Sequence, residues 1–141
     1  NTGKEAMQFQ NTIKQCLDQF HFKAGKPAMF QVEGNERQPQ SWEKLLKEKI
    51  NPQVSFIVFI LPGQKGKGTC YSEIKSMLMS KIPVPNQVVL ASTISRGKNL
   101  RSICTKILIQ MNAKLGGIPW SVTQLPFFNQ ATMIVGLDTF S

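Results

Sequence analysis

The chain has 141 residues, the size of one domain, with 41% hydrophobic and 18% charged residues. This balance excludes an intrinsically disordered chain. No apolar stretch reaches the roughly 18 residues that span a membrane, and the polar start Asn1-Thr2-Gly3 predicts no signal peptide. Three cysteines, far apart, fit a reducing compartment and form no metal-binding pattern. We expect an intracellular protein, nuclear or cytoplasmic, with no membrane partner.

The net charge of +9 is concentrated in the middle of the chain. Residues 61–114 hold nine Lys and Arg against the single Glu73, so this segment alone carries +8. Such a block is typical of a surface that binds a polyanion, most often nucleic acid. On charge alone, a basic surface that only keeps the protein soluble remains an alternative.

Helices and strands alternate along the sequence. Apolar residues at spacings of three and four predict helices, and runs of β-branched and aromatic residues predict strands. The expected helices cover about residues 3–20, 42–49, 71–81 and 98–115. The expected strands cover residues 28–32, 54–61, 87–91, 120–122 and 133–138. This alternation predicts an α/β fold with a Rossmann-like parallel sheet flanked by helices.

Local signals set the ends of several elements. Thr2 and Glu5 have the spacing of a capping box at the start of the first helix. Ser41 is expected to cap the second helix, and Gly116-Gly117 should end the last one. The apolar strand over 54–61 should be buried on both faces of the sheet.

Open parallel sheets bind ligands beyond the carboxyl ends of their strands. That edge is expected to gather the glycine-rich loop after Leu61, the helix start at Tyr71 and the segment after Ala91. Tyr71 and Lys75 are four residues apart and so share one helix face near its start, where phosphate is attracted. Taken alone, each lysine also fits the solvated face of an ordinary helix. The glycine loop has neither the Walker ending nor the dinucleotide-binding pattern.

The segment Tyr71-Ser72-Glu73-Ile74-Lys75, followed by Gln87 and later by Lys114-Leu115-Gly116-Gly117, resembles the MID domain of Argonaute proteins. The position of Trp120 after this segment resembles the pattern of the Piwi clade of Argonaute proteins. Residues 133–138 are similar to the first strand of the PIWI, RNase H-like domain. The resemblance implies a MID domain over 1–128 and the start of the PIWI domain over 129–141.

The resemblance further implies binding of the 5′-monophosphorylated end of a small single-stranded guide RNA in a piRNA-like silencing pathway, with the PIWI domain of the same chain as a partner. Tyr71 corresponds to the aromatic residue on which the first base stacks. Lys75, Gln87 and Lys114 match positions that contact the 5′-phosphate. Gln110 matches a phosphate-site position where Piwi proteins use a divalent cation, so it is a possible Mg²⁺ ligand in the full-length protein, with none expected in isolation.

A loop between the first buried strand and the helix at Tyr71 is implied to read the first base, with uridine favoured. Its residues are Gln64, Lys65, Gly66, Lys67, Gly68, Thr69 and Cys70. The basic surroundings of Cys70 are expected to lower the pKa of its thiol. His21 has no evident Ser or Cys partner and is not assigned a catalytic role.

We expect a binding domain, not an enzyme. Asp138 aligns with the first catalytic carboxylate of RNA-cleaving relatives, but Thr139-Phe140-Ser141 departs from the family pattern. One carboxylate cannot build a two-metal site, so any RNA-guided cleavage belongs to the parent protein. Two alternatives remain: a small α/β phosphotransferase or nucleotidase that uses the glycine loop, and a basic protein-interaction module.

Overall fold

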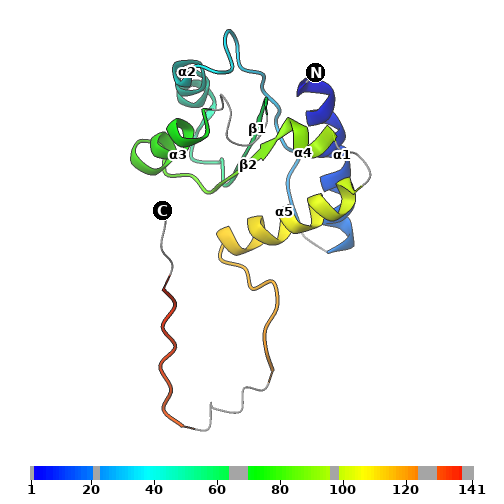
Figure 1. The fold of residues 1–141 in the computed structure, drawn as a ribbon, viewed down its shortest axis with the longest axis vertical. Coiled ribbons are helices and arrows are strands. Elements are labelled where there is room, and N and C mark those ends of the chain that lie inside the picture. The colour runs from blue at the N-terminus through cyan, green and yellow to red at the C-terminus, as the bar shows by residue number, and fades with distance from the viewer. Residues whose placement is uncertain (1, 21–22, 64–69, 96–98, 124–129, 138–141) are drawn as a thin grey trace.

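A computed structural model describes residues 2–20, 23–63, 70–95, 99–123 and 130–137. Within these residues helices and strands alternate, as Figure 1 shows. In chain order they are α1 (Thr2–Gln19), α2 (Pro39–Lys49), β1 (Ile57–Leu61), α3 (Tyr71–Ser80), β2 (Asn86–Leu90), α4 (Ala91–Ser95) and α5 (Leu100–Lys114).

The described residues contain a two-stranded parallel sheet. Strands β1 and β2 pair in a register that runs from Ile57 opposite Asn86 to Leu61 opposite Leu90. Parallel neighbours need a crossover connection, and α3 supplies it. The crossover turns α3 back along the sheet, so its later turns approach the amino ends of the strands.

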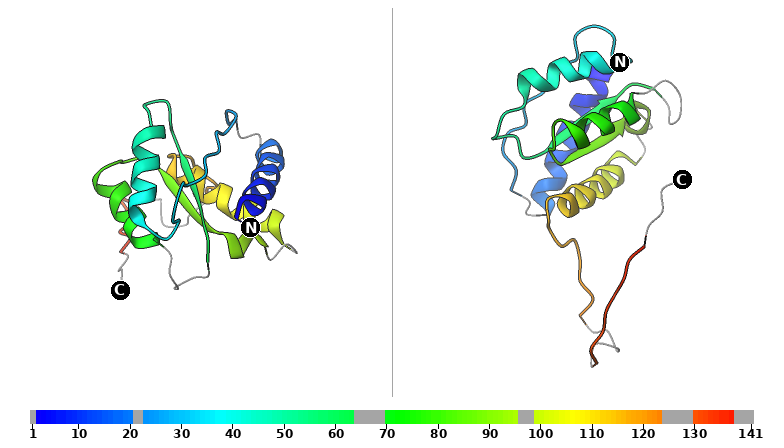
Figure 2. Two further views of the ribbon diagram at one scale, coloured as in Figure 1. Left: turned by 90° about the horizontal axis from the view of Figure 1, so that it is seen from above. Right: turned by 90° about the vertical axis from the view of Figure 1, so that its left-hand side faces the viewer.

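Helices cover both faces of this sheet, as the two views in Figure 2 show. Because side chains alternate along a strand, Phe59 and Leu61 face α2 and α3, whereas Ile60 packs with α1, α4 and α5. On the first face Trp42 meets Phe59 edge to face, with 5.8 Å between ring centroids, and donates its indole N–H to the Glu36 carbonyl at 2.9 Å. The predicted α/β class with helices flanking a parallel sheet is confirmed.

The predicted helices are present, with different ends. Helix α2 begins at Pro39, whose ring fixes a helical φ, so Ser41 lies inside the helix and does not cap it. Thr2 is likewise the first helical residue of α1. The expected helix over 98–115 is α5, and the separate short helix α4 before it was not predicted. Gly116 ends α5 as expected, at a φ of 83° that favours glycine.

Three predicted strands are wrong for the residues that the structure describes. Residues 28–32 form no strand, although Val32 is buried against the α2–α3 side of the core. Residues 120–122 and 133–137 also form no strand. A strand needs neighbouring backbone partners, and in Figures 1 and 2 the segment after α5 leads away from the α/β body while residues 130–137 stand apart from it.

The first testable prediction concerns the face of α3 that packs on the sheet. Ile74 is fully buried, with no exposed surface, whereas Met79 on the same helix is 84% exposed. We expect Ile74→Ala to lower the free energy of unfolding by about 2–5 kcal/mol, because it removes buried methyl groups and leaves a cavity. Urea unfolding followed by circular dichroism measures the change.

Met79→Ala is the matched control on the same helix. It should change the free energy of unfolding by less than about 0.5 kcal/mol, since its side chain lies in solvent. Equal losses for the two variants would contradict this packing of α3.

Candidate phosphate-binding site

The start of α3 is held in place by a buried cysteine. Cys70 precedes the helix, and its thiol donates a hydrogen bond to the Arg37 carbonyl at 2.7 Å, turned away from the helix start. The expectation of a lowered thiol pKa is wrong. Burial, and then the nearby charge of Glu73, raise the pKa of Cys70 above its usual value. This thiol therefore ties the helix start to the turn before α2.

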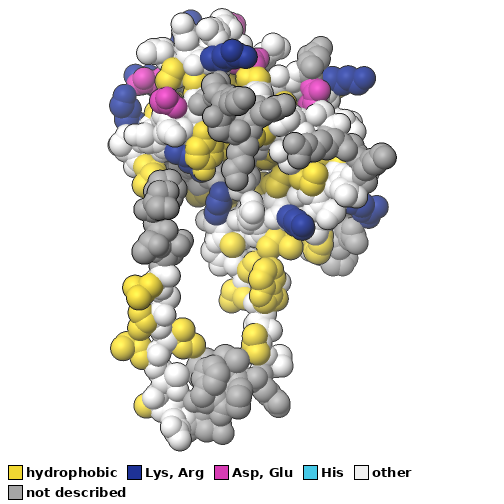
Figure 3. All heavy atoms as spheres, viewed as in Figure 1, with side chains coloured by type: hydrophobic (Ala, Val, Ile, Leu, Met, Phe, Trp, Pro, Cys, Tyr) yellow, Lys and Arg dark blue, Asp and Glu magenta, His cyan; other side chains and the backbone are white. Residues whose placement is uncertain are grey.

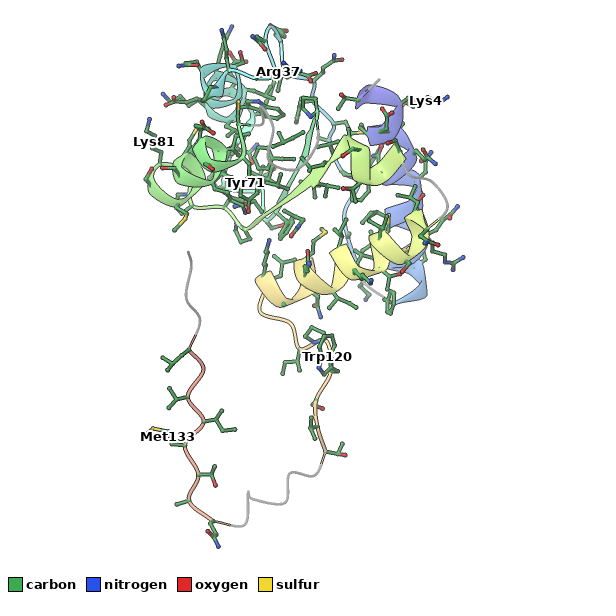
Figure 4. The ribbon with its side chains drawn as sticks, viewed as in Figure 1. Lys4, Arg37, Tyr71, Lys81, Trp120 and Met133 are labelled. Atoms are coloured by element: carbon green, nitrogen blue, oxygen red, sulfur yellow. The ribbon has the colours of Figure 1, made fainter. Side chains whose placement is uncertain are left out.

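Tyr71 and Lys75 share one face of α3, as their spacing predicts. The Tyr71 side chain is 48% exposed, and the Lys75 Nζ lies 5.9 Å from the centre of its ring. Figure 4 shows Tyr71 on the side of α3 toward β2, while Lys81 at the end of the helix reaches Glu43 of α2 at 3.1 Å. An open aromatic ring beside an ammonium group is thus placed where both can meet one ligand.

Lys75 reaches from α3 to the first residue of β2. Its ammonium donates to the Asn86 Oδ1 at 2.5 Å, and the Asn86 Nδ2 in turn donates to the Val84 carbonyl at 2.9 Å. Lys75 is half-buried by these contacts. Burial lowers the pKa of its ammonium below the ordinary lysine value.

Lys114, the last residue of α5, arrives at the same place from the other face of the sheet. Its ammonium donates to the backbone carbonyl of Asn86 and to the Gln87 Oε1, both at 2.7 Å. The Gln87 Nε2 donates to the Val88 carbonyl at 3.2 Å, which leaves the amide oxygen toward the lysine. Four residues that the sequence singled out, Tyr71, Lys75, Gln87 and Lys114, are therefore linked through contacts at the start of β2.

The charge of this lysine cluster, defined as Lys75, Asn86, Gln87 and Lys114, is uncompensated among the described residues. Every hydrogen bond that the structure gives the two ammonium groups goes to a neutral oxygen. The pKa of Lys114 is lowered by partial burial and then by the positive charge of Lys75. Two like charges held together without a carboxylate between them attract an anion.

The cluster lies at the amino end of β2, not at the carboxyl edge that the sequence indicated. Asn86 is the first residue of β2, and the lysines come from the middle of α3 and the end of α5. Both helices run back along the sheet after their strands, which carries their later turns to the opposite edge. The two lysines therefore do not follow the rule that open parallel sheets bind ligands beyond the carboxyl ends of their strands.

Other predicted site residues are not brought into the cluster. Gln110 lies one turn before Lys114 on α5, is exposed, and has no side-chain hydrogen bond to the cluster within the described chain. Residues 64–69 of the implied base-reading loop, His21 and Asp138 lie outside the described residues. Sequence reasoning also missed Asn86, whose only signal is a polar residue directly after Pro85 at the start of a strand.

A groove elsewhere on the surface is less suited to an anion. It has a volume of about 310 Å³ and lies between residues 29–33 and α2. Its charged lining residues are Glu33, Lys44, Glu48 and Lys49. These two acidic and two basic side chains cancel, so the lysine cluster is the stronger candidate.

The described residues offer neither a membrane-spanning helix nor a metal-binding cluster. No helix among them is long and apolar enough to cross a membrane. They also contain no group of three or more His, Cys, Asp or Glu side chains that could hold a metal ion.

Comparisons with known proteins identify the family. Residues 56–141 match the family described as Piwi domain. The chain belongs to the Argonaute and Piwi family. It is 33% identical to Piwi-like protein 1 of Gallus gallus over 95% of the chain and 14% of that protein. It is 29% identical to Protein argonaute-3 of Drosophila melanogaster over 99% of the chain and 15% of that protein.

Protein aubergine of Drosophila melanogaster is 39% identical over 62% of the chain and 10% of its own length. The chain thus spans about a seventh of the length of these two relatives, Piwi-like protein 1 and Protein argonaute-3. The Piwi-domain match covers both sides of the expected 128/129 boundary, which stays a prediction.

The second testable prediction concerns the repulsion between the two lysines. Lys75→Met removes one positive charge and keeps much of the side-chain length, so we expect the pKa of Lys114 to rise toward 10.5. Burial continues to lower it, and the recovery is therefore incomplete. The pH dependence of the Lys114 Cε signal in carbon-13 NMR measures this pKa.

Lys106→Met is the control, because Lys106 lies on the same helix two turns away and is exposed. It should leave the Lys114 pKa nearly unchanged. If Lys75→Met also leaves it unchanged, the two ammonium groups do not face each other in solution.

Proposed function

We propose that this chain binds the 5′-monophosphorylated end of a small single-stranded guide RNA in a piRNA-like silencing pathway. The observation that carries the proposal is the meeting of Lys75 and Lys114 at neutral oxygens of β2, beside the open ring of Tyr71. Family membership supports RNA as the source of the phosphate. The proposal treats residues 1–128 as a MID domain and residues 129–141 as the start of a PIWI domain that it contacts.

Each side chain has a distinct role in this proposal. The two ammonium groups form charge-assisted hydrogen bonds with the phosphate oxygens, each contributing about 1.5–3 kcal/mol. The Gln87 amide turns to contact the phosphate as well. The first base stacks on Tyr71, which contributes about 1–3 kcal/mol and leaves that base unpaired.

The proposed role is binding without chemistry in this chain. A terminal phosphate carries about −1.5 to −2 at neutral pH, and the two ammonium groups offset this charge only in part. The cluster contains no carboxylate, thiol or imidazole that could act as a general base or nucleophile. RNA cleavage, where the parent protein performs it, therefore depends on groups outside the lysine cluster.

The third testable prediction compares a short RNA with a 5′-phosphate and the same RNA with a 5′-hydroxyl, at one salt concentration. We expect the phosphate to strengthen binding on the order of 100-fold, which corresponds to about 3 kcal/mol. Lys75→Ala and Lys114→Ala should each remove much of this preference. Fluorescence anisotropy with labelled RNA measures the dissociation constants.

Lys106→Ala removes the same charge from an exposed position on α5 and should keep the preference. Equal binding of the two RNAs by the unaltered chain would contradict the proposal and favour a general polyanion-binding or acidic-protein-binding surface. Hydrolysis of a nucleoside monophosphate by the chain would instead favour the enzyme alternative.

We further propose that Mg²⁺ joins this site only together with the phosphate. Gln110 offers one neutral amide oxygen near Lys114, and Mg²⁺ needs about six oxygen ligands. The described residues therefore do not form a magnesium site by themselves. Phosphate oxygens and water would have to supply the remaining ligands.

The fourth testable prediction follows from this shortage of protein ligands. Adding Mg²⁺ should strengthen binding of the 5′-phosphorylated RNA and EDTA should reverse the gain, whereas binding of the 5′-hydroxyl RNA should not respond. Gln110→Lys should make the phosphate preference resistant to EDTA, because the new ammonium replaces the charge of the cation. A preference that does not change with Mg²⁺ or EDTA in the unaltered protein would exclude the metal.

A further inference from the structure

One residue that was not predicted, Asn86, contacts both lysines of the cluster. Its side-chain oxygen accepts a hydrogen bond from Lys75 at 2.5 Å, and its backbone oxygen accepts one from Lys114 at 2.7 Å. Helices α3 and α5, which lie on opposite faces of the sheet, are therefore joined through Asn86, the first residue of β2.

The side chain of Asn86 is held in one orientation. Its Nδ2 donates to the Val84 carbonyl at 2.9 Å, so the amide oxygen must point the other way, toward Lys75. A flipped amide would direct N–H groups at an ammonium group and an oxygen at a carbonyl, and both contacts would be repulsive. The orientation is thus determined by both neighbours.

The backbone of Asn86 is fixed as well. The Pro85 carbonyl accepts a hydrogen bond from the Ile57 N–H at 3.0 Å, which directs it toward β1. Successive carbonyls along a strand point in opposite directions, so the Asn86 carbonyl faces the open edge of β2. Lys114 satisfies that carbonyl, and a buried or half-buried carbonyl without a partner is unfavourable.

These contacts leave a defined set of donors for a ligand. An ammonium group has three N–H donors. Among the described residues Lys75 uses one of them on Asn86, and Lys114 uses two, on Asn86 and Gln87. While Gln87 keeps its contact with Lys114, three N–H donors remain on the pair for a ligand, and a Gln87 amide that turns to the phosphate would free a fourth.

We propose that Asn86 is a positioning residue of the phosphate site, which holds Lys75 and Lys114 close together before the ligand arrives. This inference rests on the proposed function. Without Asn86, two like charges on long flexible side chains would move apart, and binding would have to bring them together again. The Asn86 side chain positions Lys75, and the Asn86 backbone carbonyl positions Lys114.

The fifth testable prediction uses the ratio of 5′-hydroxyl to 5′-phosphate dissociation constants, which is the phosphate preference. We expect Asn86→Ala to lower the preference about tenfold, because one hydrogen bond to a charged group is lost. In a chain that already carries Lys75→Ala, adding Asn86→Ala should lower the phosphate preference less than about twofold. In a chain that carries Lys114→Ala, Asn86→Ala should still lower the phosphate preference severalfold, because the Asn86 side chain acts through Lys75.

Asn86→Ser shortens the side chain but keeps an oxygen, and it should restore part of the preference. Asn11→Ala is the control, because Asn11 is an exposed asparagine on α1. Circular dichroism checks that each variant is folded. Should Asn86→Ala fail to fold, Asn86→Ser and Asn86→Thr provide the same comparison, with a smaller loss expected for the hydroxyl side chains.

The outcomes separate the two proposals. An unaltered chain with no phosphate preference overturns the proposed function. A clear preference that Asn86→Ala leaves unchanged overturns the positioning role alone. A tenfold loss that persists in the Lys75→Ala background also overturns it, because Asn86 would then act independently of Lys75.

Discussion

The parallel pairing of β1 with β2 is the constraint on which the site depends. Parallel strands need a crossover, and the register opposite Ile57 places Asn86 at the first position of β2. Helices α3 and α5 then lie on opposite faces of the sheet, and their side chains Lys75 and Lys114 both reach Asn86 at this end. A shift of one residue in the register would turn the Asn86 carbonyl toward β1 and remove one of the two acceptors of Lys114.

The sequence predicted most of what local chemistry determines. Spacing of apolar residues predicted the four long helices. The apolar run before Leu61 predicted β1, but the strand begins only at Ile57 and Val58 is exposed, so it is not buried on both faces as expected. The resemblance gave Tyr71, Lys75, Gln87 and Lys114, which the structure links through contacts. It did not give Asn86, because an asparagine at a strand start has many possible roles and only the register shows which neighbours it meets.

The wrong strands have a common physical cause. Apolar, β-branched segments predict strands, but a strand forms only where another backbone can pair with it. Figure 3 shows apolar side chains along both extended segments after α5, and Figure 4 places Trp120 and Met133 on them, away from the α/β body. Met133 is 83% and Leu137 is 92% exposed, so these segments lack the partners that their composition requires.

The lysine cluster links binding to stability. Lysines whose pKa is lowered in the folded state bind protons more weakly there than in the unfolded chain. Their charges therefore oppose folding below the lowered pKa values, and this penalty disappears as the pH rises from those values to 10.5. A bound phosphate changes the sign of the effect, because an anion favours the charged form of both ammonium groups and stabilises only the folded state. The closeness of the two charges, which lowers the pKa of Lys114, is thus also what the proposed phosphate would use.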